Sequence, residues 1–370
     1  MNARLESFFL RKTSTARVQL DALDGLRGVA VLIVVLSHLS NAGLFLIPGL
    51  DFRGTGKSGV FLFFVLSAFL LTRPLLASTS PLGHPRGWLA YALRRALRVL
   101  PLYWLVLFVN WAVTHWAPTP AMPSLTTQEW IRHMLFQEGK GVYWTIPVEC
   151  SYYLVLPFVA LTYRALRLDP GRVTLATATA IGAALWLWPP SEAPRDTLQL
   201  GFYLPIFLLG SYAAFLDQVC LADPMQPGRR QLVRWGAIAA IVGAVSLSPA
   251  GGSALLGETL PKNWAHREFL AFGVLWSILV LGALHGKGPL SWALSTRALR
   301  VVGVFSFSVY LWHVPVARSI VLLNMPNPFV ITWLVIAASL GAGMLSFSLF
   351  EWPLTRSRPV TRWFARLNTR

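Results

Sequence analysis

Two ionisable side chains stand out in the first long apolar stretch of the chain. Arg27 and His38 are separated by eleven residues. At 100° per residue, this spacing is about 20° more than three full turns, so both side chains project from one helix face, roughly 16 Å apart along its axis. Ionisable groups inside a bilayer are rare and usually functional. The alternative is that Arg27 extends to the membrane interface and His38 caps the outer end of the helix.

A carboxylate and two further groups could serve the same chemistry. Glu149 lies in the segment 144–149 (WTIPVE), at the outer start of a later apolar run. It is either a site residue or a carboxylate that interacts with the positive end of its helix. Tyr310 and His313 lie in the segment 305–315, and Glu351 closes the last apolar run. His313 could instead be a core histidine, and Glu351 an interfacial residue.

Four arginines lie at one side of the membrane. Arg94, Arg95 and Arg98 immediately precede the third apolar run, and Arg73 ends the second. Planar guanidinium groups bind phosphate with two parallel hydrogen bonds, so several together are suited to a polyphosphate ligand. The alternative is an ordinary basic anchor on the cytoplasmic side of the membrane.

Apolar helices must position these residues, because 55% of the 370 residues are hydrophobic and only 13% are charged. A soluble domain carries roughly a quarter of charged residues. We therefore predict an all-α, polytopic integral membrane protein with about ten transmembrane helices. It forms a single domain, with an N-terminal tail (1–21), a transmembrane bundle (22–352) and a C-terminal tail (353–370). The predicted spans are 22–46, 57–78, 99–117, 143–165, 173–190, 198–217, 232–249, 268–286, 300–323 and 329–352.

The basic residues predict the orientation of these helices. With the N-terminus inside, 23 Lys and Arg residues fall on the cytoplasmic side and 7 on the outer side. Cytoplasmic loops carry the excess of basic residues, so both termini are predicted to be cytoplasmic. Topology and contact with anionic lipid account for the net charge of +17 without nucleic acid.

Six segments together resemble the acyltransferase-3 family of integral-membrane O-acyltransferases, over nearly the whole chain. Two positions depart from the family pattern: Ala68 stands where glycine is usual, and Cys150 stands where an acidic residue is common. The second departure puts in doubt any role that Glu149 would share with a second carboxylate. The segments are 23–28 (LDGLRG) continuing to His38, 59–70 (GVFLFFVLSAFL), 94–103 (RRALRVLPLY), 144–149 (WTIPVE), 305–315 (FSFSVYLWHVP) and 351–353 (EWP).

The resemblance implies transfer of an acyl group, usually acetyl, from acetyl-CoA or another acyl-CoA to a hydroxyl of a glycan or other acceptor. It also implies a multi-pass protein of the bacterial cytoplasmic membrane. Some family members carry a C-terminal hydrolase-like domain, and this chain is expected to act without one. The acceptor, the acyl length and the oligomeric state stay open, and so does the side of the membrane on which the acceptor binds.

Each candidate residue has a predicted role in the acylation of an alcohol. His38 is predicted to be the general base, and Glu149 to orient its imidazole as the acid of a catalytic triad does. Arg27 would hold the donor or polarise its carbonyl, and the arginines at 73, 94, 95 and 98 would bind the CoA phosphates. Direct transfer and a covalent acyl-histidine are both open. No metal site is expected.

Two other classes of membrane protein remain compatible with this sequence. A transporter or exporter of a glycan or small molecule would also bury charges among about ten helices, but should show inverted repeats, which are not evident. A membrane acyltransferase of a different fold could also use a buried histidine. A non-catalytic scaffold would not need buried titratable groups.

Overall fold

The backbone forms helices almost throughout, because in lipid every N–H and C=O group must be bonded within its own segment or its neighbours. The computed structural model describes residues 18–77, 85–222, 226–261 and 264–368, and these contain no β-strand. The longer helices are α2 (Val18–Asn41), α3 (Gly56–Leu76), α4 (Pro85–Trp116), α6 (Thr145–Ala165), α7 (Pro170–Leu187), α8 (Leu200–Ala222), α9 (Pro227–Ser246), α12 (Phe269–His285), α15 (Ser306–Val321) and α16 (Pro328–Ser346).

Shorter helices connect these elements. They are α5 (Thr127–Met134), α10 (Pro249–Leu256), α11 (Trp264–Arg267), α13 (Pro289–Leu294), α14 (Arg297–Val304), α17 (Trp352–Thr355) and α18 (Arg358–Asn368). The segment 118–142 contains α5, whose N-terminus is fixed by reciprocal hydrogen bonds between Thr126 and Glu129. The backbone N–H of Thr126 and the ammonium of Lys140 lower the pKa of the Glu129 carboxyl to about 2.

The all-α membrane fold is confirmed, and the count of ten spans is approximate. In the described part of the chain, six helices are long and apolar enough to cross a membrane. The number rises to eight if two bent pairs, α9 with α10 and α14 with α15, each form one span. Bends of 81° and 77° break these pairs. The apolar helix α12 has only 17 residues, and α7 does not meet the same criteria.

Helix α4 begins at Pro85 rather than at residue 99. Proline is favoured in the first helical turn, and arginine is a good helix former, so the basic stretch continues the helix beyond its apolar part. Arg94, Arg95 and Arg98 are therefore helical residues, not a loop before the helix. The C-terminal residues 358–368 form α18, which packs against α4.

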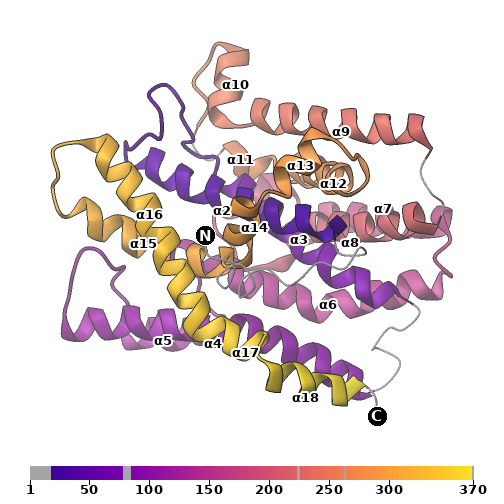
Figure 1. Cartoon of the computed structure of the whole chain (residues 1–370), viewed down its shortest axis with the longest axis horizontal. Helices are drawn as coiled ribbons and strands as arrows, with labels where there is room; N and C mark the ends of the chain where they lie inside the picture. Colours follow the sequence, from indigo (N-terminus) through magenta and orange to yellow (C-terminus); the bar gives the residue numbers. More distant parts are fainter. Residues whose placement is uncertain (1–17, 78–84, 223–225, 262–263, 369–370) are drawn as a thin grey trace.

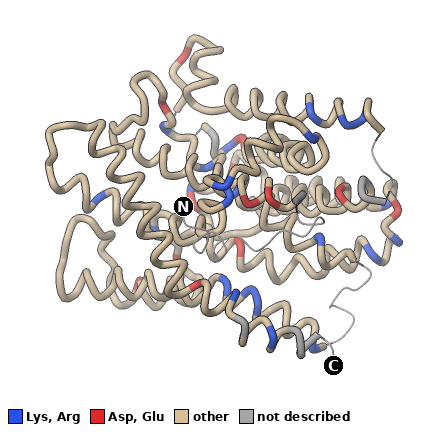
Figure 2. The backbone as a smooth tube through the Cα atoms, viewed as in Figure 1, with Lys and Arg blue, Asp and Glu red and all other residues tan. Residues whose placement is uncertain are grey.

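Helix α3 lies at the centre and packs against α2, α6, α8 and α12 (Figure 1). Lys and Arg residues gather toward the right-hand edge of the view, near the ends of α6, α7 and α9, and around the start of α4 (Figure 2). The loops at the left-hand edge carry few basic residues. The charge asymmetry expected from the sequence is thus present along the long axis of the molecule.

Glycines let α14 lie unusually close to α2. A β-carbon at Gly28 would stand 2.4 Å from the Leu299 carbonyl oxygen of α14, and one at Gly25 would stand 1.7 Å from the Leu294 carbonyl oxygen at the end of α13. On the other side, a β-carbon at Gly303 would be 1.7 Å from the Asp24 oxygen. Backbone atoms cannot yield as a flexible side chain can, so these positions exclude any larger residue.

We expect Gly28→Ala to lower the free energy of unfolding by about 1–3 kcal/mol, because the added methyl would meet the Leu299 carbonyl oxygen and force α2 and α14 apart. Thermal unfolding in detergent measures the effect. Gly182→Ala in α7 is the matched control, since nothing lies within 4 Å of a β-carbon there. Equal melting temperatures for the two variants would contradict the close contact between α2 and α14.

Candidate active site

Two cavities meet inside the bundle. The smaller has a volume of about 270 Å³ and the larger about 990 Å³. Val60 of α3 and Tyr310 of α15 line both cavities, so these two side chains form the wall between them. The Tyr310 hydroxyl donates to the Val142 carbonyl at 2.7 Å and accepts from the Thr145 hydroxyl at 3.1 Å. Hydrogen bonds on both sides fix this part of the wall.

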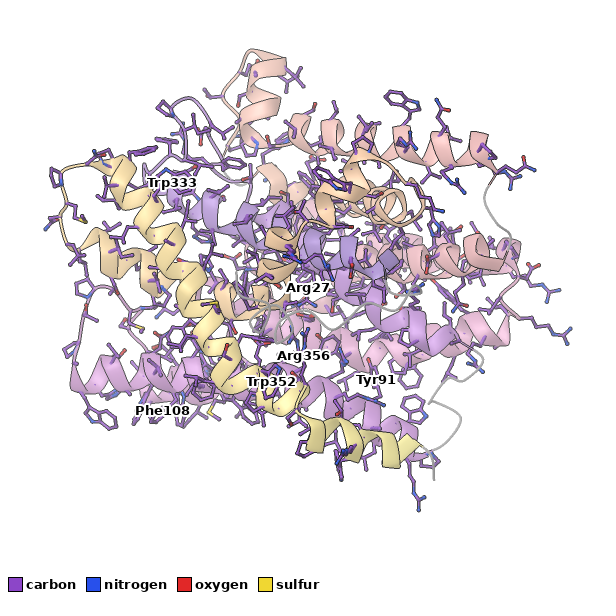
Figure 3. All side chains as sticks on the ribbon, viewed as in Figure 1. Arg27, Tyr91, Phe108, Trp333, Trp352 and Arg356 are labelled. Atoms are coloured by element: carbon purple, nitrogen blue, oxygen red, sulfur yellow. The ribbon has the colours of Figure 1, made fainter. Side chains whose placement is uncertain are left out.

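Arg27 lines the smaller cavity and lies near the middle of the molecule in the view of Figure 3. Its Nε has no hydrogen-bond partner among the described residues. The charges that act on its guanidinium include Asp24, Glu149 and Glu351, which attract it, and Arg98, which repels it. A buried guanidinium with a free donor at a cavity surface can bind an oxygen of a ligand.

His38 lines the larger cavity, as the periodicity of α2 predicts for a residue three turns beyond Arg27. Its side chain is accessible from that cavity although protein atoms surround it. The Ser37 hydroxyl accepts from the backbone N–H of Gly56 at 2.9 Å, which fixes the end of α2 against the start of α3. The two residues on one face of α2 therefore reach two different cavities.

A second imidazole lies beside His38. The ring centroids of His38 and His313 are 5.0 Å apart, with an edge-on geometry. His313 is 1% exposed, and its Nδ1 lies 2.7 Å from the Tyr310 carbonyl oxygen. A carbonyl only accepts, so Nδ1 carries the proton, and the bare Nε2, which has no partner among the described residues, can accept one.

The structure does not bring Glu149 to His38. Glu149 lines the smaller cavity with Arg27, and its Oε1 accepts hydrogen bonds from the hydroxyls of Ser67 and Tyr153, both at 2.5 Å. Glu149 and His38 thus line different cavities, and the ring beside His38 is that of His313. Ser67 was not singled out from the sequence, because a serine in an apolar helix gives no signal of its own.

The four arginines that were predicted to bind the acyl-CoA phosphates fall into two groups. Arg95 and Arg98 line the smaller cavity, and Arg95 Nε has no partner in the described residues. Arg94 lies outside that lining, donates to the Ala90 carbonyl at 3.2 Å and stacks over the Phe364 ring. Arg73 also lies outside both cavities.

Two buried carboxylates pair with these arginines. Asp217, 1% exposed, lies 2.7 Å from Arg73 Nε and 2.8 Å from His285 Nε2. Glu351, which is 2% exposed, lies 2.6 Å from Arg98 and accepts a hydrogen bond from the Ser308 hydroxyl. A π-helical turn, Phe347–Glu351, directs Glu351 inward, and such turns often occur at functional sites. Glu351 thus supports the cavity wall by holding Arg98.

A cluster that the sequence did not reveal borders the larger cavity. Lys57 Nζ lies 2.8 Å from Asp196, 3.2 Å from His266 Nδ1 and 4.7 Å from the centre of the Trp144 ring. Burial and the Lys57 charge hold the pKa of His266 below its ordinary value. Lys57 lies in the first turn of α3, Asp196 in the loop before α8 and His266 in α11, so only the fold brings them together. No group of three or more potential metal ligands occurs among the described residues.

Comparison with known proteins supports the family resemblance. A family model described as an acyltransferase domain matches residues 20–350. A peptidoglycan O-acetyltransferase of Listeria monocytogenes is 24% identical over 94% of this chain. A protein of Komagataeibacter xylinus, provisionally named a membrane-bound transacylase, is 26% identical over 79% of this chain and 72% of its own length. No solved structure matches significantly.

The chain spans part of its relatives. It covers 57% of the Listeria protein. It covers 48% of a Bacillus subtilis protein provisionally named a peptidoglycan O-acetyltransferase, which is 26% identical over 80% of this chain. The matched region in all three includes most of the helical bundle described here.

Arg73→Met should lower the free energy of unfolding by about 3 kcal/mol, because it leaves the buried Asp217 without its arginine partner. Thermal unfolding in detergent tests this. Arg53→Met is the control, since the pair of Arg53 with Asp51 is exposed and should contribute little. An Arg73 variant as stable as the wild type would return Arg73 to the set of candidate ligand-binding residues.

Proposed function

This chain belongs to the acyltransferase-3 family of membrane acyltransferases, and on that premise we propose that it moves an acyl group, most simply acetyl, from acyl-CoA to a hydroxyl of a glycan or other acceptor. One observation carries the proposal. Arg27 and His38 project from one face of α2 into two cavities that share the wall formed by Val60 and Tyr310. A donor on one side and an acceptor on the other would meet at this wall.

The smaller cavity is the proposed donor site. Its volume of about 270 Å³ suits the pantetheine arm of CoA and leaves the nucleotide outside. The free N–H of Arg27 would bind an oxygen of the pantetheine arm and so hold the acyl donor in place. Arg95, with a free Nε at the same cavity, would bind a phosphate or pantetheine oxygen. Arg98, held by Glu351, would add positive potential.

The larger cavity is the proposed acceptor site, with His38 as general base. Its imidazole would take the hydroxyl proton while the acceptor oxygen attacks the thioester carbonyl and the C–S bond breaks. The leaving thiolate then takes the proton from the imidazolium. His313 would orient His38 by offering the bare Nε2 to an N–H of the His38 ring. Because Arg27 and His38 are roughly 16 Å apart along the axis, the donor arm has to extend past Tyr310. An acyl-histidine intermediate is the second route.

We place the larger cavity on the outer side of the cytoplasmic membrane, with both termini inside. The concentration of basic residues at the opposite end of the bundle supports this orientation (Figure 2). The peptidoglycan acceptors named for two relatives are also outside the cytoplasm. The family match favours acyl transfer over transport as the activity of the two-cavity arrangement.

His38→Ala should slow acyl transfer about 10²–10⁴-fold without affecting folding, because it removes the base and leaves a small apolar residue. Release of CoA thiol from acetyl-CoA, with a cell-wall disaccharide as acceptor, measures the rate in lipid nanodiscs. Arg27→Lys should also transfer the acyl group slowly, since lysine keeps the charge and lacks the planar guanidinium with its paired N–H groups. His115→Ala, at the exposed end of α4, is the control. Near wild-type transfer by His38→Ala would overturn the mechanism.

Arg95→Gln should weaken acyl-CoA binding by about tenfold or more, the loss of one charge-assisted hydrogen bond. Calorimetric titration of the purified variant with a non-hydrolysable acyl-CoA analogue measures the dissociation constant. Arg94→Gln, whose side chain lies outside the cavity, should bind nearly as the wild type does. If the two variants lose affinity equally, the donor does not occupy the smaller cavity.

A further inference from the structure

The larger cavity carries a surplus of positive charge. Four basic side chains, Lys57, Lys140, Arg195 and Arg318, and a single carboxylate, Asp196, line it. The two histidines in the lining, at positions 38 and 266, add little positive charge at neutral pH, because imidazole is a weak base. A cavity of about 990 Å³ with this charge balance attracts anionic ligands.

Most of these cations already have acidic partners. Lys57 lies 2.8 Å from Asp196, and Lys140 lies 3.0 Å from Glu129. Arg195 lies 3.7 Å from the other oxygen of Asp196 and is 78% exposed. These ion pairs occupy the charges of the two lysines, which therefore have little capacity left to bind an anionic ligand.

Arg318 is different. It has no hydrogen-bond or ion-pair partner among the residues that the structure describes. Tyr310, Val314 and Arg318 recur every four residues along α15, and all three line the larger cavity, so one face of this helix points into it. The positive charge of Arg318 also acts on the His38 imidazole. A free guanidinium and the proposed base thus face the same space.

We propose that Arg318 binds an anionic oxygen group of the acceptor, most specifically the carboxylate of an acidic sugar, and thereby places a hydroxyl of the same molecule at His38. This inference rests on the proposed function, because it takes the larger cavity as the acceptor site. The planar fork of arginine matches a carboxylate with two parallel hydrogen bonds. The rings of Tyr143, Trp144 and Tyr310 provide apolar surface for the sugar face.

Equilibrium binding without donor tests the site. The probes are the disaccharide of N-acetylglucosamine and N-acetylmuramic acid and the same disaccharide with its carboxylate converted to the carboxamide. The full chain in nanodiscs of zwitterionic lipid should bind the acid about tenfold or more tightly than the amide. Arg318→Gln should abolish this preference and leave amide binding unchanged. Arg53→Gln, an exposed outer-loop arginine outside the cavity lining, should keep it.

Three outcomes would overturn the proposal. The wild type could bind acid and amide equally, or Arg318→Gln could keep the preference. Alternatively, anionic lipid added to the nanodiscs could remove the preference, which would show that Arg318 binds a lipid headgroup instead. A second measurement tests the proposed function independently of the anion site. It is acetyl transfer from acetyl-CoA to the same disaccharide. An acid preference without any transfer would refute the proposed function and leave the anion site in place.

Discussion

The close contact between α2 and α14 is the constraint on which the site depends. Gly28 and Gly303 bring the two backbones so near that a β-carbon at either would overlap a main-chain oxygen, and Gly25 meets the end of α13 in the same way. This contact fixes the rotation of α2 about its own axis. Arg27 lies between two of these glycines and lines the smaller cavity, and His38, three turns further along the same helix, lines the larger one.

The buried charged side chains differ in whether they have a partner within the protein. Asp217 and Glu351 are paired with arginines, and these pairs hold neighbouring helices together. Arg27 and Arg95 line the smaller cavity, and each keeps a buried nitrogen without a partner in the described chain. An unpaired polar atom in a protein interior costs free energy, so its presence at a cavity surface indicates that a ligand or substrate completes it.

Interruptions in the helices give the site its shape. The 77° bend between α14 and α15 lets the first helix pack on α2, while the second turns so that Tyr310 and His313 meet the end of α2. The π-helical turn before α17 directs Glu351 toward Arg98. Regular helices through either point would send these side chains elsewhere, toward lipid or a neighbouring helix.

The sequence alone determined the membrane class, the helical architecture, the shared face of Arg27 and His38 and the charge asymmetry, because hydropathy and helical periodicity are local properties. It did not determine the partners. The pairing of His38 with His313, of Glu149 with Ser67, and of Arg73 with Asp217 joins residues far apart in the chain. Which charge is satisfied and which stays free depends on helix rotation and packing, and only the tertiary structure decides these.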